Sequence, residues 1–378
     1  MLRYLTAGES HGPGLAVILD GMPAGLRIDL KFINDELSQR QGGYGRGPRM
    51  KIETDRVQLW SGLKSGRTIG SPLTLIVPNK DSSLEGLPAV TTPRPGHADL
   101  AGMMKFGLLD ARPVLERASA RETAARVALG AVAQLFLKEF GVTIQSWVVS
   151  IGPVQVRSLS PAETERNLSR SVLSCPDPTA EKKMIRLIDR ARSAGDTLGG
   201  IFLVKAVGVP PGLGGYSQPS DRLDARLTAA LMSIPAIKAV EVGEGWRMAG
   251  TTGRKAHDEI LPGKDGFLRP TNRAGGIEGG MSNGQEIVLR AAMKPISTLG
   301  RPLRTVNLLT GKTAPAARER SDVCALPAAA VVGRAVVALE LADVWLRKFA
   351  GDTVSEVRAA WKGYLKRMAR ITRVEAKG

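Results

Sequence analysis

A long apolar helix, predicted from about Val114 to Phe140, is the clearest secondary-structure pattern of this 378-residue chain. Ala124 and Ala128 lie near helical spacing within it, and Gly141 follows its last residue, where glycine commonly ends a helix. Elsewhere, short strand patterns alternate with helical ones. The combination predicts an α+β protein.

The remaining elements are shorter, and the same criteria of apolar spacing and terminating residues locate them. Strands are predicted at 3–6, 15–19, 73–77, 143–151, 200–208 and 285–293. Helices are predicted at 33–40, at 161–194, from Ser220 or Asp221 to Ile234, and from after Ser321-Asp322 to 350. No Pro- or Ser-rich linker divides the chain, and no solenoid repeat occurs. We therefore expect a single domain, and we expect the basic stretch at 353–378 to form a solvated helix.

Histidine is used sparingly in this chain. Of three histidines, His11 and His97 lie in polar, glycine-flanked loops, Gly8 to Gly12 and Arg94 to Asp99. Histidine is the side chain that most readily changes charge near neutral pH, so both are candidates for proton transfer. A structural or surface role for each is the alternative. The third, His257, has two acidic neighbours but no second ligand cluster for zinc, so we expect it to be structural or exposed.

The chain carries 53 Lys and Arg against 36 Asp and Glu, a formal net charge of +17. Such an excess attracts polyanions, including nucleic acid, anionic membranes and small molecules with phosphates and carboxylates. Aromatic residues make up only 4% of the chain, which is scarce for a protein that stacks single-stranded bases. The arginines also cluster beside glycine-rich loops instead of forming long basic runs. Small anionic ligands are therefore favoured.

Cysteine content and hydropathy exclude several other classes of protein. Cys175 and Cys324 are too few for a disulfide framework or a zinc site. No apolar run approaches the ~20 residues that span a bilayer. Glu9 precedes any apolar stretch of signal-peptide length. We expect a cytoplasmic protein without a bound metal and without a membrane span.

Arg40, Arg46 and Arg49 surround a glycine-rich loop that begins at Gln41. This loop matches neither the dinucleotide fingerprint nor the Walker A pattern. Glycine lets backbone N–H groups approach phosphate oxygens, and arginine offers paired donors to the same oxygens. The three arginines are therefore a candidate anion clamp, with a basic surface loop as the alternative.

Arg117 and Arg121 stand four residues apart in the long helical pattern, hence on one face. Their charges would repel unless an anion lay between them, and a helix start near Ala118 would strengthen its attraction. Asp110 and Arg112, just upstream, are candidates to orient this cluster. The alternative is a pair of arginines that snorkel over an apolar surface.

Asp343 ends an apolar stripe of the last long helix, where Val332, Val336 and Leu339 precede it at helical spacing. A half-buried carboxylate has a raised proton affinity and can exchange protons near neutral pH. The alternative is a surface ion pair with Arg347, four residues on.

Three segments resemble the signatures of the chorismate synthase family and follow one another along the chain in the order of those signatures: Gly8 to Gly12, Arg94 to Ala124, and Arg320 to Pro327. Residues 45–50, 274–280 and 294–298 also agree, and the resemblance runs from Thr6 to about Asp352. It implies a sandwich of antiparallel sheets and helices, with 1–352 as the catalytic domain, and a homotetramer. The implied enzyme is a lyase of the shikimate pathway in aromatic amino acid biosynthesis. It would eliminate phosphate from 5-enolpyruvylshikimate 3-phosphate in the anti-1,4 sense, giving chorismate, with reduced FMN and no net redox change.

The resemblance also implies roles for individual residues. His11 would protonate the departing phosphate, His97 would protonate or stabilise reduced flavin, and Asp343 would help accept the substrate's C6 proton. The substrate would contact Ser10, Arg40, Arg46, Arg49, Arg112, Arg121 and Arg320. The flavin would contact Arg117, Ala118, Ser119, Pro235, Ala236, Gly279, Lys294, Pro295, Ile296, Ser297, Thr298 and Arg320. NADPH, as a reductant, would bind Arg40 and Arg46.

Two departures from the family accompany the match. Residues 82–86 read Ser-Ser-Leu-Glu-Gly where many members carry tryptophans, and Pro235 stands where an amide side chain is expected. An external flavin reductase, instead of NADPH bound by this chain, could supply the electrons. An RNA-binding protein and a flavin oxidoreductase are the alternative functions. The scarce aromatics and missing RNA-binding signatures argue against the first, and the missing dinucleotide fingerprint against the second.

Overall fold

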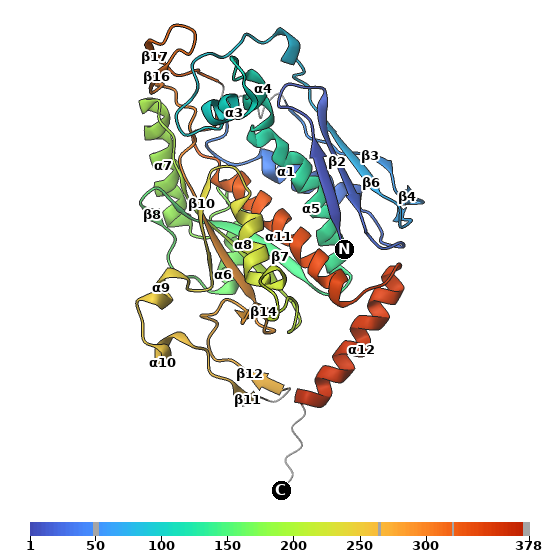
Figure 1. The fold of residues 1–378 in the computed structure, drawn as a ribbon. Helices are drawn as coiled ribbons and strands as arrows, with labels where there is room; N and C mark the ends of the chain where they lie inside the picture. The colour runs from blue at the N-terminus through green and yellow to red at the C-terminus, as the bar shows by residue number, and fades with distance from the viewer. Residues whose placement is uncertain (48–52, 264–265, 320, 373–378) are drawn as a thin grey trace.

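The computed structural model describes residues 1–47, 53–263, 266–319 and 321–372. A layer of helices lies between a four-stranded and a five-stranded sheet (Figure 1). In this layer α5 packs on the first sheet, α11 packs on the second, and the two helices pack against each other. The bounds are α1 (Leu30–Gln41), α5 (Thr123–Lys138) and α11 (Leu326–Lys348). This sandwich confirms the predicted α+β class.

The first sheet is antiparallel, with the strand order β1-β2-β6-β3. Its strands are β1 (Arg3–Ala7), β2 (Gly14–Asp20), β3 (Gln58–Ser61) and β6 (Leu73–Pro78). In β2, Leu15, Val17 and Leu19 are buried while Ile18 is exposed, which is the period-two pattern of a sheet with one covered face. The strands predicted at 3–6, 15–19 and 73–77 are confirmed.

The second sheet has the order β10-β15-β9-β7-β8 and is also antiparallel. Its strands are β7 (Thr143–Ile151), β8 (Val154–Gln155), β9 (Gly200–Val207), β10 (Ile237–Val242) and β15 (Ile287–Met293). Three of these were predicted, all with bounds within two residues. The two edge strands, β8 and β10, were not predicted.

The predicted helix from Val114 to Phe140 is interrupted. It consists of α4 (Arg112–Arg117), the 3₁₀ turn η2 (Ala120–Glu122) and α5. The break lies at Ser119, whose backbone is extended and whose side chain accepts a hydrogen bond from the Arg121 amide. Serine competes in this way with the helical ladder. The single-helix prediction was therefore wrong at its first turns.

The helical stretch predicted at 161–194 is also divided, into α6 (Pro161–Leu168) and α7 (Pro178–Ala194). Asp177 caps the second helix by accepting from the Thr179 and Ala180 amides, and Pro178 occupies its first position. The helix predicted up to Ile234 is α8 (Leu223–Met232), and the one predicted up to 350 is α11.

The basic tail forms α12 (Val354–Thr372). One of its faces packs on the domain: Trp361 contacts Phe140 and Trp345, and Tyr364 contacts Phe349, with ring centroids 5.4–6.0 Å apart. The tail is therefore solvated on one side only.

The remaining elements are short. They are β4 (Leu63–Lys64), β5 (Arg67–Thr68), η1 (Leu84–Gly86), α3 (Asp99–Phe106), η3 (Pro219–Asp221), α9 (Trp246–Ala249), α10 (Gly253–Ala256), β11 (Leu261–Gly263), β12 (Gly266–Leu268), β13 (Ile277–Glu278), β14 (Met281–Ser282), β16 (Arg304–Val306) and β17 (Thr313–Pro315). In the part of the chain that the structure describes, no helix is long and apolar enough to span a membrane.

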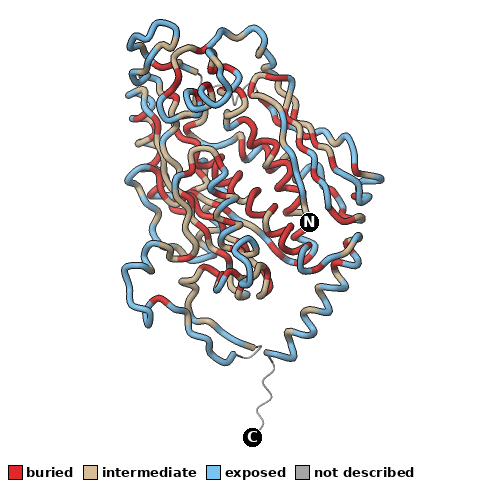
Figure 2. Tube along the Cα trace, in the orientation of Figure 1, coloured by how far each residue is buried: buried red, intermediate tan, exposed pale blue. Residues whose placement is uncertain are grey.

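Buried residues follow the helix layer and the inner faces of both sheets (Figure 2). A second, smaller apolar cluster lies beside α3 and α4 and contains Val90, Met103, Ala111 and Leu115. This small cluster supports the loops at one end of the sandwich, where the functional site lies.

Candidate active site

A cavity of about 510 Å³ opens at this end of the molecule, within the range of ordinary ligand pockets. Its walls come from loops and helix ends that are far apart in the sequence. Among the described residues, its lining includes Ser10, His11, Arg40, Arg46, Arg94, His97, Ala118, Ser119, Arg121, Thr123, Pro235, Ala236, Lys294, Ile296, Ser297, Thr298, Glu319, Ser321 and Asp322. The cavity thus gathers both loop histidines and several arginines.

His11 lies in the loop that joins β1 to β2. Gly8 starts this loop with φ +103°, and a Cβ there would lie 2.2 Å from the Gly14 carbonyl oxygen, so only glycine fits. The loop is held from outside: the Asn79 side-chain amide donates to the carbonyls of Glu9 and Gly12. The position of His11 is therefore fixed by tertiary contacts as well as by the turn itself.

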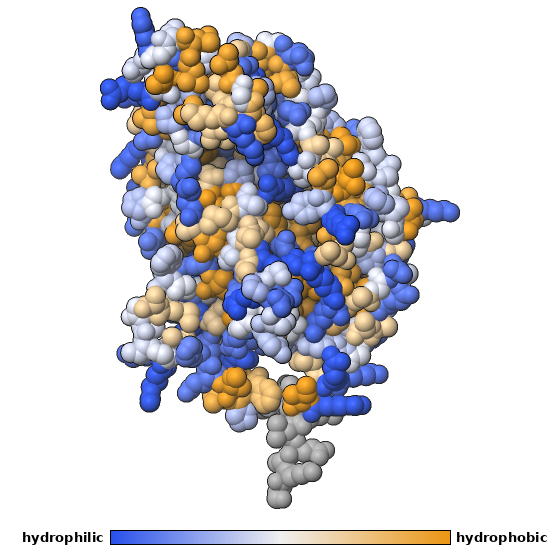
Figure 3. Space-filling view, viewed as in Figure 1, coloured by the Kyte–Doolittle hydropathy of each residue, from blue (hydrophilic) through white to orange (hydrophobic). Residues whose placement is uncertain are grey.

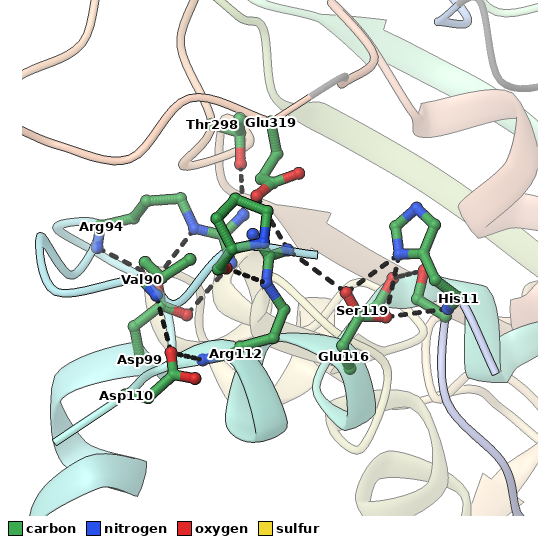
Figure 4. Close-up of polar contacts among 12 residues, drawn as sticks. His11, Val90, Arg94, Asp99, Asp110, Arg112, Glu116, Ser119, Thr298 and Glu319 are labelled. Carbon is green, nitrogen blue, oxygen red and sulfur yellow. Dashed lines mark hydrogen bonds and ion pairs between the residues drawn. The ribbon is translucent and has the colours of Figure 1, made fainter. Parts of the chain in front are cut away.

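The ring of His11 contacts a fully buried carboxylate, Glu116 of α4 (Figure 4). Nδ1 lies 2.9 Å from each Glu116 oxygen, and the His11 backbone amide donates to Oε2 at 2.8 Å. Burial by itself raises the pKa of Glu116, but hydrogen bonds from His11 and Arg112 hold it below its usual value. Glu116 is therefore ionised at neutral pH.

His97 has a similar carboxylate partner, Asp99. Nδ1 of His97 lies 2.5 Å from Asp99 Oδ1, and Arg94 donates to the same carboxylate and to Thr298 (Figure 4). Burial raises the pKa of Asp99, but the hydrogen bonds from His97 and Arg94 outweigh it and the pKa is lowered. Both histidines of the cavity are thus paired with anionic carboxylates.

The arginine side of the cavity is built on buried ion pairs. Arg40 donates to Thr123 and lies 3.4 Å from Asp55, which Arg121 contacts at 2.5 Å. Burial lowers the pKa of Arg40 to about 10, which leaves the guanidinium charged at neutral pH. Arg46 lies 2.6 Å from Asp322. These ion-paired arginines place positive charge along one wall of the cavity.

An apolar patch forms another wall, where Ile234 meets Ala328, Ala329 and Val332 of α11. Beside it Ala236 has φ +69°, a conformation that strains a non-glycine residue and is common at functional sites. Lys294 lies at the edge, 3.0 Å from the Gly96 carbonyl. An apolar patch with cationic side chains at its margin suits a planar, anionic cofactor.

The structure brings many of the predicted site residues to the cavity. Of the predicted catalytic residues, His11 and His97 line it; of the predicted substrate contacts, Ser10, Arg40, Arg46 and Arg121 do. Of the predicted flavin contacts, Ala118, Ser119, Pro235, Ala236, Lys294, Ile296, Ser297 and Thr298 line it. Arg49 and Arg320 lie outside the described residues.

Four predicted residues lie away from the cavity lining. Arg117 donates to the Thr6 and Gly8 carbonyls, because the break at Ser119 turns it away from Arg121. Gly279 lies in the β13–β14 turn. Pro295 does not line the cavity, although its neighbours Lys294 and Ile296 do. Arg112 contacts Glu116 and Glu319 instead of the cavity. Arg117 and Arg121 therefore contact different groups, and the anion site between them stays a prediction.

Asp343, a predicted catalytic residue, also lies away from the cavity lining, and its role as a proton acceptor stays a prediction. Its carboxylate contacts Arg226 and Arg347 and accepts from the Leu2 amide, away from the cavity lining. Burial raises its pKa, but the Arg226 hydrogen bond, the Leu2 amide and Arg347 bring it below the usual value. The predicted raised proton affinity is contradicted, and the salt-bridge alternative with Arg347 holds.

Sequence reasoning missed the carboxylates that matter here: Glu116, Asp99, Glu319 and Asp322. All four lie inside or beside the signature segments, and Glu116 directly precedes Arg117. The available signal was the i,i+4 spacing of Arg112 and Glu116, which marks a paired acid. Nothing local showed that this acid would face His11.

The comparisons with known proteins agree with one family. A model of the family described as chorismate synthase matches residues 2–346. The chorismate synthase of Desulforudis audaxviator (strain MP104C) is 53% identical over 383 residues, 97% of this chain and 98% of the relative. That of Carboxydothermus hydrogenoformans (strain ATCC BAA-161 / DSM 6008 / Z-2901) is 51% identical over 382 residues, covering 98% of this chain and 100% of the relative. A solved structure described as "Crystal Structure of Chorismate Synthase" has a TM-score of 0.82 and 40% identity, and the match covers 98% of both chains.

Proposed function

The chain belongs to the chorismate synthase family, and we propose that its cavity binds 5-enolpyruvylshikimate 3-phosphate beside reduced FMN. Members of this family are lyases of the shikimate pathway that eliminate phosphate to give chorismate. The observation that carries the proposal is the meeting of His11 and His97, each paired with a carboxylate, in one arginine-lined cavity.

Substrate binding follows from the charge of the cavity wall. The substrate carries a phosphate and two carboxylates, and Arg40, Arg46 and Arg121 line the cavity with guanidinium groups that match them. An ion pair at ~4 Å contributes about 4 kcal/mol at an effective dielectric near 20, before desolvation. Ser10 adds a hydroxyl, and Arg49 and Arg320 stay predicted contacts.

His11 is the proposed general acid for the departing phosphate. Its loop is fixed, its ring lines the cavity, and Glu116 holds its Nδ1 at 2.9 Å. Proton transfer of this kind typically contributes ~100- to 10,000-fold in rate. His97, held by Asp99, is the proposed proton donor toward the cofactor.

Reduced flavin, when bound, would supply electron density to the substrate during an elimination without net redox change. The residues present fit it: the apolar patch on α11 can face the ring system, and Lys294 can face its negative charge. The proposed flavin contacts are Ala118, Ser119, Pro235, Ala236, Lys294, Ile296, Ser297 and Thr298. At Pro235 only the ring and backbone can contribute, because it has no amide side chain.

Asp322 is a second candidate, beside Asp343, for accepting the substrate's C6 proton. It lines the cavity, where it contacts Arg46 at 2.6 Å and accepts from the Gly47 amide at 2.6 Å. An ionised carboxylate at this wall can accept a proton from a bound substrate. Glu319 is the other acid among the described lining residues.

Three finer points complete the proposal. Arg40 and Arg46 are the proposed contacts for NADPH if this chain reduces its own flavin; otherwise an external reductase supplies the electrons.

A homotetramer is supported by exposed apolar residues on the four-stranded sheet, on α3 and on the β16–β17 hairpin, among them Leu5, Met104 and Leu309 (Figure 3). A cytoplasmic location is supported by two buried free thiols, Cys175 and Cys324.

The test is anaerobic phosphate release from 5-enolpyruvylshikimate 3-phosphate with pre-reduced FMN, with oxidised FMN, and with oxidised FMN plus NADPH. Release only in the assay with pre-reduced FMN supports the lyase activity and an external source of electrons. Release also with oxidised FMN plus NADPH would mean that this protein reduces its own flavin. Absence of release under all three conditions, from folded protein, refutes the proposed chemistry. His11→Ala and His97→Ala should each lower the rate more than tenfold.

A further inference from the structure

We propose that Glu116 is a positioning residue that fixes the tautomer of His11, so that Nδ1 carries a proton for Glu116 and Nε2 is the atom that works in the cavity. The inference deepens the proposed function and rests on it for the role of His11. It assigns a task to a buried carboxylate that takes no part in binding. Glu116 has a side chain with 0% exposure, and it is not among the residues that line the cavity.

The contacts of Glu116 reach both the ring and the backbone of His11. The backbone amide of His11 donates to Oε2, both oxygens lie 2.9 Å from Nδ1, and the Ser10 amide donates to the Glu116 carbonyl at 3.1 Å. One residue of α4 therefore fixes the loop and the ring orientation together. An ionised carboxylate can only accept, so Nδ1 must be the donor. The neutral ring then has its lone pair on Nε2.

Arg112 holds the carboxylate from the side opposite His11. Its Nη1 lies 3.4 Å from Glu116 Oε1 and 3.0 Å from Glu319 Oε1, and its Nε donates to the Pro88 carbonyl at 3.1 Å (Figure 4). The amide of Arg112 is in turn bound by Asp110. This chain of contacts keeps Glu116 anionic and in place beside the His11 ring.

The charged groups around His11 determine how its protonation responds to a change at Glu116. Glu116 contacts Nδ1, Asp81 lies 3.9 Å from Nε2, and Arg112 stands behind Glu116. The cavity wall adds the cations Arg40 and Arg121. Replacing Glu116 by glutamine removes the negative charge that contacts Nδ1, which disfavours the protonated ring. In the proposed reaction, a proton passes from Nε2 to the phosphate oxygen as the C–O bond breaks, leaving neutral His11 protonated at Nδ1.

The direct test is ¹⁵N NMR of histidine side chains in the full-length protein, where only three histidines give signals. His11→Asn assigns the His11 resonances by their loss. In the wild-type protein above the titration midpoint, we expect Nδ1 to be protonated and Nε2 to be bare. A neutral His11 with the proton on Nε2 would overturn the proposal, and this measurement needs no Glu116 variant to fold.

Glu116→Gln supplies the functional readout. We expect the His11 titration midpoint to move down by at least one pH unit, and kcat for phosphate release to fall 10- to 100-fold. KM should stay within threefold, and the limb on which activity is lost as pH rises should move to lower pH by a similar amount. Unchanged titration and unchanged pH profile in this variant would refute the positioning role.

Glu122→Gln is the matched control. Glu122 is also a buried acid with an i,i+4 arginine, Arg126 at 3.0 Å, but it does not contact His11. We expect the His11 signals and the pH profile of the Glu122→Gln variant to match those of the wild-type protein. If wild-type protein releases no phosphate, the proposed function fails, whereas the tautomer of His11 still decides the role of Glu116.

Discussion

Two histidines of this chain share one local arrangement, in which the ring faces the cavity and Nδ1 rests on a buried carboxylate. At His11 the partner is Glu116, and at His97 it is Asp99. Both acids are ionised because histidine and arginine hydrogen bonds outweigh the effect of burial on their pKa. At the scale of single residues, the orientation of each ring therefore depends on its carboxylate partner.

Asp322→Asn and Asp343→Asn separate the two candidate carboxylates. We expect Asp322→Asn to lower kcat by at least tenfold, because its carboxylate lies in the cavity beside Arg46. Asp343→Asn should leave kcat within threefold, since its carboxylate contacts Arg226 and Arg347 away from the lining. Phosphate release with pre-reduced FMN measures both; the reverse ranking would favour Asp343 as the group that accepts the substrate's proton.

Asp343→Asn should instead lower stability in a pH-dependent way. The folded pKa of Asp343 lies below its ordinary value of 3.8, so its ion pairs stabilise the fold above that pH. Breaking such a pair costs about 3 kcal/mol at neutral pH. Urea unfolding at pH 7 and at pH 3 should show the difference from wild type shrinking as the pH falls. A constant difference at both pH values would contradict this linkage.

At the scale of elements, the crossing of α5 and α11 controls the width of the helix layer. Gly130 and Ala335 meet there, and the Cβ of an alanine at 130 would lie 2.4 Å from that of Ala335. The break between α4 and α5 is equally decisive, because it directs Glu116 to His11 while Arg121 faces the arginine wall.

Gly130→Ala should destabilise the protein, although alanine is the better helix former. Overpacking of this kind costs about 1–3 kcal/mol. Gly363→Ala is the control on α12, where a Cβ meets no atom within 4 Å, and it should stabilise by up to about 1 kcal/mol. Thermal unfolding of both variants shows whether each substitution lowers or raises the stability of the protein. Stabilisation by Gly130→Ala would show that α5 and α11 can separate without cost.

At the scale of the whole molecule, the cavity belongs to residues 1–352 and the tail supports them. Among the described residues, none of α12 lines the cavity, yet Val357 is fully buried and Trp361 covers Phe140 and Trp345. We therefore propose 1–352 as the catalytic domain and 353–378 as a stabilising appendage.

A chain that ends at Asp352 should unfold at a lower temperature than the full chain, because the aromatic cluster of Trp345 and Phe349 becomes exposed to water. Below that temperature its phosphate release should stay within threefold of the full chain. Trp361→Ala should lower the unfolding temperature by part of the same amount. Loss of phosphate release from the folded, shortened chain would show that α12 takes part in the site.

The amino-acid sequence by itself determined the α+β class, six of the nine strands of the two main sheets as described, the family and the two loop histidines, because these follow from local periodicity and from contiguous motifs. The tertiary structure alone decided which carboxylates contact these histidines. Asp343 has the spacing of a buried acid, but Arg226 and Arg347 neutralise it outside the cavity, whereas Glu116 reaches His11 across 105 positions of sequence. A helix break at Ser119, too local to disturb the apolar pattern, turned Arg117 away from Arg121. Charge pairing depends on distance in space, and sequence spacing specifies that distance only within one element.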